Sequence, residues 1–263
     1  MTKPDPNFIW SIADLLRGPY RPKEYGTVIL PFTVLARFES VLAPTKDSVL
    51  AASEKHENAP ALVRDMMLKR ASGEEFYNTS EFSLSKLGDP ANLSANLINL
   101  IEGYNAEVRE IFERFDMTNV IRTLDDRDRL PDIVKRFAAL DVHPSRVSNA
   151  EMGDVFEELI RRFMESSKDL AGDYFTPREV VRLLVSLLFA PDTEDLSDPH
   201  LIRQVYDPTC GTGGMLSEAH QWMEQHGGQA TLSLYGQEFN ALSHAMAKAD
   251  LLIRRQDPSN IVF

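Results

Sequence analysis

Hydrophobic residues recur at helical spacing through the first 140 residues of the chain. One such pattern covers residues 8–16. A second runs from about residue 24 to 42, and Pro31 inside it predicts a kink or a break. We predict no strand in this region, so residues 1–145 are expected to form a helical N-terminal domain. The clearest stripe predicts one long helix over residues 92–116, with the apolar positions Leu93, Leu97, Leu100, Ile101, Tyr104, Val108, Ile111, Phe112 and Phe115.

The pattern changes after Asp141-Val142-His143-Pro144-Ser145, a stretch that predicts a hinge. Amphipathic helices are expected over residues 152–164 and from Thr176 to Leu188. The following segments alternate: strands at 201–206, at 232–235 and from 260, with helices over 215–223 and 242–252. Because alternating strands and helices are typical of a parallel doubly wound sheet, we predict an α/β, Rossmann-like domain over residues 146–263.

Composition and charge limit the classes of protein to which the chain can belong. The chain of 263 residues carries a formal net charge of −12, which argues against a protein that wraps nucleic acid by itself. A local basic groove, or a DNA-binding partner that supplies most of the positive charge, remains compatible with this value. One cysteine excludes an internal disulfide framework, and no apolar run approaches the ~18 residues of a membrane span. With no apolar signal core at the N-terminus, a cytoplasmic protein is expected.

A glycine loop, Asp207-Pro208-Thr209-Cys210-Gly211-Thr212-Gly213-Gly214, lies between a predicted strand and a predicted helix. Open α/β sheets bind nucleotides at this position. The loop has neither the Gly-Lys-Ser/Thr ending of a phosphate-binding loop nor a G-x-G-x-x-G fingerprint. The Asp207 carboxylate suits an amino group, such as that of a methionine moiety, better than a pyrophosphate. A tight turn without any ligand is the alternative.

An acid follows the second predicted strand. Glu238 comes 25 positions after Gly213, and acids at such a position hydrogen-bond ribose hydroxyls in nucleotide-binding folds. NAD and S-adenosylmethionine both contain this ribose, so Glu238 does not choose between them. An exposed loop acid without function is the other interpretation.

A helix start is predicted at Thr176, with Thr176 as N-cap, Pro177 at the first helical position and Glu179 completing a capping box. Capping alone would explain these residues. The free N–H groups and the positive end of the helix dipole could also hold a carboxylate, such as that of methionine. Arg178 could assist or could contact DNA.

These pieces together resemble the modification subunit of type I restriction–modification systems, over nearly the whole chain. The resemblance rests on Met152 to Phe163 (MGDVFEELIRRF), Ala171 to Val181 (AGDYFTPREVV), Tyr206 to Leu216 (YDPTCGTGGML) and Tyr235 to Glu238 (YGQE). It implies a DNA adenine-N6 methyltransferase that uses S-adenosyl-L-methionine, and a target adenine flipped out of double-stranded DNA. It also implies a DNA-specificity subunit and a restriction subunit as partners. The implied cofactor site comprises Asp173, Tyr174, Phe175, Thr176, Pro177, Arg178, Thr212, Gly213, Gly214 and Glu238, beside Asp207 and Gly211 of the loop.

One departure from the family is clear. Its catalytic Asn-Pro-Pro-Phe string, or a close variant, does not occur in these 263 residues. We therefore expect a truncated chain, either an excised fragment or a split gene, that is inactive alone. The catalytic residues stay unassigned.

Three other functions are alternatives to this one. A nucleotide-dependent oxidoreductase would need a pyrophosphate site, which Asp207 disfavours. A cytosine-C5 methyltransferase would need a nucleophilic cysteine in its own loop, whereas Cys210 lies in the glycine loop and suits a small buried filler. A non-catalytic helical adaptor is the third. Residues 1–140 are expected to contact DNA or the specificity subunit.

Overall fold

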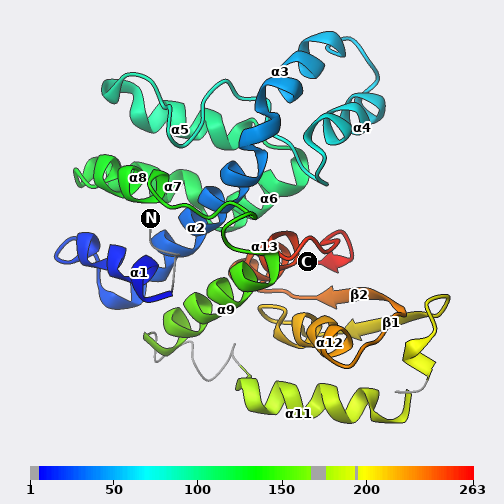
Figure 1. The fold of residues 1–263 in the computed structure, drawn as a ribbon. Coiled ribbons are helices and arrows are strands. Elements are labelled where there is room, and N and C mark those ends of the chain that lie inside the picture. Colours follow the sequence, from blue (N-terminus) through cyan, green and yellow to red (C-terminus); the bar gives the residue numbers. More distant parts are fainter. Residues whose placement is uncertain (1–5, 167–175, 193–194) are drawn as a thin grey trace. The chain divides into compact units, whose positions relative to one another are not determined.

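The computed structural model describes residues 6–166, 176–192 and 195–263 (Figure 1). Contacts between residues divide the chain into two units, Met1–Phe163 and Met164–Phe263. Within its described residues, the first unit contains helices and isolated bridges but no extended strand, as the sequence predicts. Its helices are α1 (Pro6–Ser11), α2 (Tyr25–Leu42), α3 (Lys46–Lys55), α4 (Ala61–Ser72), α5 (Leu93–Glu102), α6 (Ala106–Arg114), α7 (Met117–Asp126), α8 (Leu130–Ala138) and α9 (Asn149–Ser166), with short 3-10 turns at Ile12–Leu16, Pro22–Glu24, Ala43–Thr45 and Pro90–Asn92.

Helix α2 forms the centre of the first unit. Every residue from Val28 to Phe38 is buried, and Phe32 stacks on Phe137 of α8. The helix continues through Pro31, so a break there is excluded. Packing on all sides outweighs the hydrogen bond that the proline cannot donate. The helical run Pro22–Lys55 is long and apolar enough to cross a membrane by length and composition, but 72% of its most apolar stretch is buried inside the protein, as in a core helix.

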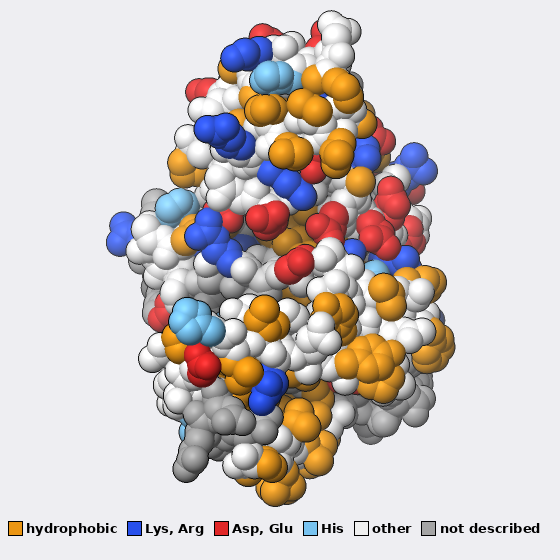
Figure 2. All heavy atoms as spheres, turned by 90° about the vertical axis from the view of Figure 1, so that its right-hand side faces the viewer, with side chains coloured by type: hydrophobic (Ala, Val, Ile, Leu, Met, Phe, Trp, Pro, Cys, Tyr) orange, Lys and Arg blue, Asp and Glu red, His pale blue; other side chains and the backbone are white. Residues whose placement is uncertain are grey.

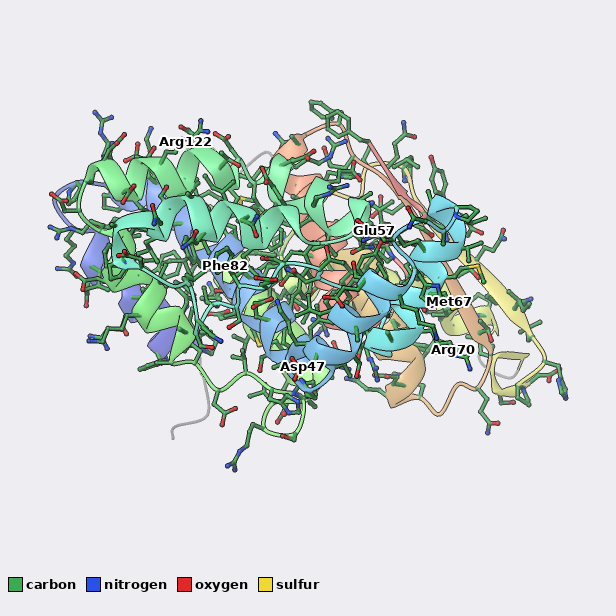
Figure 3. All side chains as sticks on the ribbon, turned by 90° about the horizontal axis from the view of Figure 1, so that it is seen from above. Asp47, Glu57, Met67, Arg70, Phe82 and Arg122 are labelled. Atoms are coloured by element: carbon green, nitrogen blue, oxygen red, sulfur yellow. The ribbon has the colours of Figure 1, made fainter. Side chains whose placement is uncertain are left out.

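Helices α3 and α4 pack against each other beside this core. Val49 and Leu68 form a small buried cluster with Tyr77. In Figure 3, Asp47 lies at the start of α3, while Met67 and Arg70 lie on α4. Gly73, at φ +71°, ends α4 in the left-handed conformation that glycine adopts without strain.

The single long helix predicted over residues 92–116 is wrong, because the structure contains two helices, α5 and α6. Backbone hydrogen bonds from another segment capture the residues between them: Thr79 donates to the Gly103 carbonyl at 2.8 Å, and Asn105 donates to the Tyr77 carbonyl at 3.2 Å. A Cβ on Gly103 would lie 2.5 Å from Asn78 Oδ1, so glycine permits this close approach. The apolar stripe continues across the break, and for this reason periodicity alone did not reveal it.

The predicted hinge is attached to the first unit. The buried guanidinium of Arg37, on α2, donates hydrogen bonds to the carbonyls of Val142 and Val147 and, at 2.6 Å, to Asn149 Oδ1. These bonds hold both ends of the 142–149 segment. Contacts divide the two units after Phe163, eighteen residues beyond residue 145. The domain boundary expected at residue 145 stays a prediction.

The second unit confirms the predicted alternation of strands and helices. Its strands are β1 (Ile202–Asp207), β2 (Thr231–Gln237) and β3 (Ile261–Val262), all parallel and in the order β1-β2-β3. Helices α11 (Arg178–Phe189), α12 (Gly214–Gln225) and α13 (Ala241–Ile253) alternate with them, and 3-10 turns occur at Ala190–Asp192 and Asp195–Ser197. In the β1–β2 pair Tyr206 lies opposite Tyr235.

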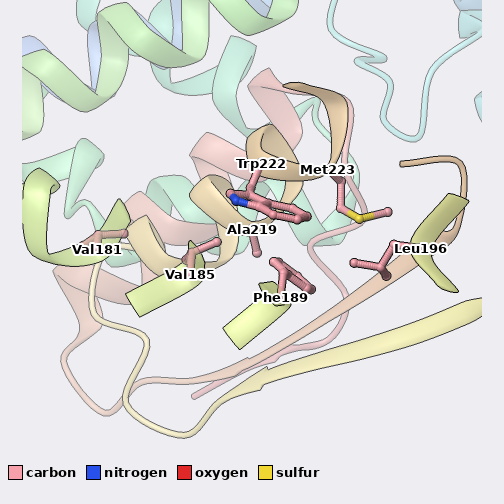
Figure 4. Close-up of a cluster of buried hydrophobic side chains, with 7 residues drawn as sticks. All are labelled: Val181, Val185, Phe189, Leu196, Ala219, Trp222 and Met223. Atoms are coloured by element: carbon pink, nitrogen blue, oxygen red, sulfur yellow. The ribbon is translucent and has the colours of Figure 1, made fainter. Parts of the chain in front are cut away.

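Helices cover one face of this sheet. Val205 and Leu232 contact both hydrophobic clusters of the unit. The first cluster joins Val181, Val185 and Phe189 of α11 to Trp222 of α12 and to Leu196, Ala219 and Met223 (Figure 4). The second joins α12 to α13 through Cys210, Leu216, Leu234, Ala247, Leu251 and Ile261. On the opposite face, Ile202 and Tyr206 are exposed.

Candidate functional site

The structure describes only some of the residues predicted to bind the cofactor at the start of α11. Asp173, Tyr174 and Phe175 lie outside the described residues. Thr176 and Pro177 are exposed, and the N-cap is Pro177, whose carbonyl accepts from Val180 N–H and Val181 N–H. The predicted cap at Thr176, with its capping box to Glu179, is therefore wrong: no side chain caps this helix, because its first turn closes one residue later.

The glycine loop joins the end of β1 to the start of α12. Asp207 accepts a hydrogen bond from Thr209 N–H at 3.1 Å, which turns the chain at the end of the strand. Cys210 N–H donates to the Gln237 carbonyl at 3.0 Å, so the loop is attached to the end of β2. Gly211 and Gly213 have φ values of +55° and +86°, a region that favours glycine.

The adjacent glycines, Gly213 and Gly214, have different roles. A Cβ on Gly213 would lie 3.3 Å from the Cβ of Ala247, so this residue allows α12 to approach α13. A Cβ on Gly214 would meet no atom within 4 Å, and Gly214 begins α12. The backbone at Gly214 therefore borders open space.

Glu238 is connected to this loop directly. Its side chain is buried, with 7% of the residue exposed, which excludes an exposed loop acid. Oε2 accepts from Gly211 N–H at 3.0 Å, and Oε1 accepts from Asn240 N–H at 2.6 Å. A carboxylate offers about four acceptor positions, so each oxygen can accept a further hydrogen bond, for example from a hydroxyl.

The start of α11 lies at the same edge of the sheet. Arg182 Nε lies 3.6 Å from Glu218 Oε1, and further along both helices Phe189 stacks on Trp222 with ring centroids 5.0 Å apart. Helices α11 and α12 therefore run in the same direction. Both begin at the edge where β1 and β2 end (Figure 1). Two helix N-termini, which favour anions, thus lie at the sheet edge that carries Asp207 and Glu238.

An aromatic residue that sequence reasoning missed lies beside Glu238. Phe239 is 83% exposed, between Glu238 and Asn240, which caps α13 by accepting from Ser243 N–H at 3.0 Å. An exposed phenyl ring at the ligand edge of a sheet offers an apolar surface for a planar ring. The signal was present in the sequence as an aromatic directly after the strand-end acid.

Cys210 is unsuited to nucleophilic chemistry. Burial raises the pKa of its thiol to about 12, and the nearby Asp207 and Glu238 carboxylates add to the effect. Because the thiolate is the reactive form, the neutral thiol is a poor nucleophile. Its position against β2 agrees with a small buried filler: a Cβ on Gly236 would lie 2.9 Å from Cys210 Sγ.

Charged side chains do not form a single-sign surface on the face drawn in Figure 2. Several Asp and Glu side chains lie close to one another on that face, whereas Lys and Arg are scattered among them and among hydrophobic side chains. This mixture agrees with the net charge of −12 and offers no continuous basic stripe on that face for DNA phosphates.

Two family models match the chain. Residues 6–137 match the HsdM N-terminal domain, and residues 147–262 match the N-6 DNA methylase family. The second match contains the glycine loop and Glu238, whereas the first contains the described helices from α1 to α8.

Named relatives agree with these matches. The chain is 30% identical to the type I restriction enzyme MjaVII methylase subunit of Methanocaldococcus jannaschii over 62% of this chain and 26% of the relative. It is 26% identical to the MjaIX methylase subunit of the same organism over 94% of this chain and 45% of the relative. This chain thus spans less than half of either relative. A type I restriction-modification methyltransferase subunit from Streptococcus thermophilus has a similar fold, with a TM-score of 0.67 and 16% identity, over 98% of this chain and 57% of that one.

Proposed function

The chain belongs to the HsdM family, and we propose that it serves as the modification subunit of a type I restriction–modification system, transferring a methyl group to N6 of adenine in DNA. The observation that carries the proposal is the hydrogen bond between Glu238 and Gly211 N–H. It joins two of the three parts of the predicted cofactor site, the glycine loop and the acid after β2, at the edge of a parallel sheet. The N-6 DNA methylase match over residues 147–262 supports the reaction class.

S-adenosylmethionine is the proposed cofactor, and it would supply the methyl group. Glu238 has the acceptor capacity to bind the ribose hydroxyls, and Phe239 presents an apolar ring to the adenine. Asp207 suits the amino group, while the N-terminus of α11 with Arg178 suits the carboxylate of the methionine moiety. The open space at Gly214 permits close approach to the backbone at the start of α12.

Double-stranded DNA is the proposed substrate, with the target adenine flipped out of the stack because its N6 is unreachable within the duplex. The net charge of −12 favours a DNA-specificity subunit as the source of most phosphate contacts, with a restriction subunit completing the assembly in the cytoplasm. We assign the helical N-terminal region to contact with the specificity subunit or DNA. No Asn-Pro-Pro-Phe-type string occurs in these 263 residues, so we assign cofactor binding to the residues named above and leave the catalytic residues unassigned.

A thermal-shift titration tests this proposal against the oxidoreductase alternative. S-adenosylmethionine and its demethylated product share the nucleoside and the amino acid, whereas NAD shares only the nucleoside and adds a pyrophosphate. The proposal predicts a concentration-dependent rise of Tm with the first two ligands and none with NAD. A rise with NAD alone would favour the oxidoreductase, and no rise with any ligand would contradict a cofactor-binding role.

A further inference from the structure

The glycine loop and the first turn of α12 are held by a buried carboxylate on each side. Before the turn, Glu238 accepts from Gly211 N–H at 3.0 Å. Beyond it, Asp250 on α13 accepts from Ser217 Oγ, while Ser217 N–H donates to the Gly213 carbonyl at 3.0 Å. Ser217 and Asp250 are 6% and 4% exposed. The backbone assigned to the cofactor is thus a short stretch between two fixed points.

Two different contacts join the start of α12 to α13. A Cβ on Gly213 would lie 3.3 Å from the Cβ of Ala247, and one turn further along both helices Ser217 meets Asp250. Packing of apolar groups limits a distance but has no preferred direction. A hydrogen bond does have a preferred direction. The bond between Ser217 and Asp250 therefore fixes the rotation of α12 about its own axis.

Asp250 is itself held in one orientation. Arg254 Nε lies 3.2 Å from its Oδ1 and 3.1 Å from its Oδ2, and both side chains are under a tenth exposed. Hydrogen bonds between ionised groups are the stronger ones in proteins. The acceptor that Ser217 meets on α13 is therefore a rigid one.

The rotation of α12 matters at Gly214, whose backbone borders open space. Successive residues of an α-helix lie about 100° apart around the axis, so a fraction of that rotation turns the open side of Gly214 in another direction. The free N–H groups of the first turn would change position with it.

We propose that Ser217 and Asp250 are positioning residues of the cofactor site, an inference that rests on the proposed function. Their hydrogen bond keeps the open backbone at Gly214 turned toward S-adenosylmethionine. Both residues act through the first turn of α12 and not by touching the cofactor. The bond therefore contributes to cofactor affinity as well as to the stability of the chain.

Substitution of Ser217 tests this proposal in the whole chain. Ser217→Ala removes the hydroxyl, leaves Asp250 with its ion pair and introduces the best helix former, so the fold should be retained. The matched control is Phe189→Leu, which loosens the packing on Trp222, near the other end of α12. Thermal melts give the loss of stability in each variant.

Two further measurements separate positioning from stability alone. The first is the affinity for S-adenosylmethionine by calorimetry. The second needs no cofactor: it is the rate at which a disulfide reagent modifies Cys210, the one cysteine of the chain and a buried residue of the loop. Modification through global unfolding follows the loss of stability in both variants, whereas local opening of the loop adds to the rate in Ser217→Ala alone.

For Ser217→Ala we expect an affinity at least about fivefold weaker, and a Cys210 reaction at least about fivefold faster, than for Phe189→Leu. Equal affinity or equal reaction rates in the two variants would overturn the proposal, because the bond would then serve stability alone. No binding by the wild type would refute the proposed function. In that case a faster Cys210 reaction in Ser217→Ala would still support its hold on the loop, and an unchanged one would overturn that as well.

Discussion

The Glu238 carboxylate accepts a hydrogen bond from the Gly211 N–H at 3.0 Å, which joins the acid after β2 to the glycine loop after β1. Its other oxygen accepts from Asn240 N–H at 2.6 Å, at the start of α13. One buried carboxylate therefore fixes a loop and a helix start relative to each other. Such fixed geometry reduces the ordering that a ligand must impose when it binds.

The two adjacent glycines should respond differently to substitution. Gly214→Val places a side chain in open space, so the fold should be retained while affinity for S-adenosylmethionine falls at least about tenfold. Gly213→Ala adopts an unfavourable φ of +86° and approaches Ala247, so it should destabilise the chain by about 1–3 kcal/mol. Thermal melts and calorimetric titrations measure both effects. Full affinity in Gly214→Val would show that ligand does not approach the backbone there.

Cys210 should be inert in the folded chain. A thiol with a pKa of about 12 is only ~10⁻⁴ ionised at pH 8, and the residue is also buried. We expect modification by a disulfide reagent at pH 8 to be at least about a hundredfold slower than in the chain unfolded in denaturant. Comparable rates in the two states would show that the loop opens readily and would restore a nucleophilic role as a possibility.

A buried ion pair at the end of α13 is also hydrogen-bonded to α12. Asp250 lies 3.1 Å from Arg254 Nε and also accepts a hydrogen bond from Ser217 Oγ on α12. Both charged side chains are under a tenth exposed, so Asp250→Ala removes a partner from a buried cation and should cost about 3–5 kcal/mol of unfolding free energy. Glu224→Ala, at an exposed carboxylate on α12, is the control. Denaturant titrations that give equal losses for the two variants would refute this role.

Glu158 on α9 should make stability depend on acid pH. Hydrogen bonds from Arg161, followed by those from Arg162, lower the pKa of its carboxyl to about 2, against an ordinary value of 4.5. A lowered folded-state pKa contributes stability that is fully present above about pH 4.5 and is lost as the pH falls toward 2. The stability difference between wild type and Glu158→Gln should therefore shrink over that range. Glu113→Gln, at an exposed acid on α6, is the control. A stability difference between wild type and Glu158→Gln that stays constant with pH would contradict this role of Glu158.

The second unit was largely predictable because its signals are local. The strand before Asp207, the glycine loop and the strand before Glu238 follow each other at short distances in the sequence, and all three appear within a few residues of the predicted bounds. Their meeting at one edge follows from parallel topology alone. The hydrogen bond between Glu238 and Gly211 was not predictable, because its geometry depends on how β2 ends beside the loop.

The errors lie where distant contacts decide local structure. Residues 92–116 form two helices because the 77–79 segment binds the backbone between them. Another contact that the sequence does not signal joins Arg37 to the 142–149 segment over more than a hundred residues, while the boundary expected at residue 145 stays a prediction. Neither contact can be predicted from the spacing of apolar residues in the sequence. Phe239 was missed for another reason, since a single exposed aromatic carries no periodic signal.

Calorimetric titration of S-adenosylmethionine into the wild-type chain and into Glu238→Gln tests the central claim most directly. A glutamine side chain accepts hydrogen bonds only through its amide oxygen, because its amide nitrogen is a donor. It therefore loses one of the two bonds from Gly211 N–H and Asn240 N–H, and it keeps only one atom that can accept from a ribose hydroxyl. We predict one binding site per chain in the wild type and at least about a tenfold weaker affinity in the variant, with Glu224→Gln unchanged. No binding by the wild type, or equal affinity for wild type and Glu238→Gln, would contradict a cofactor site built on Glu238 and the glycine loop.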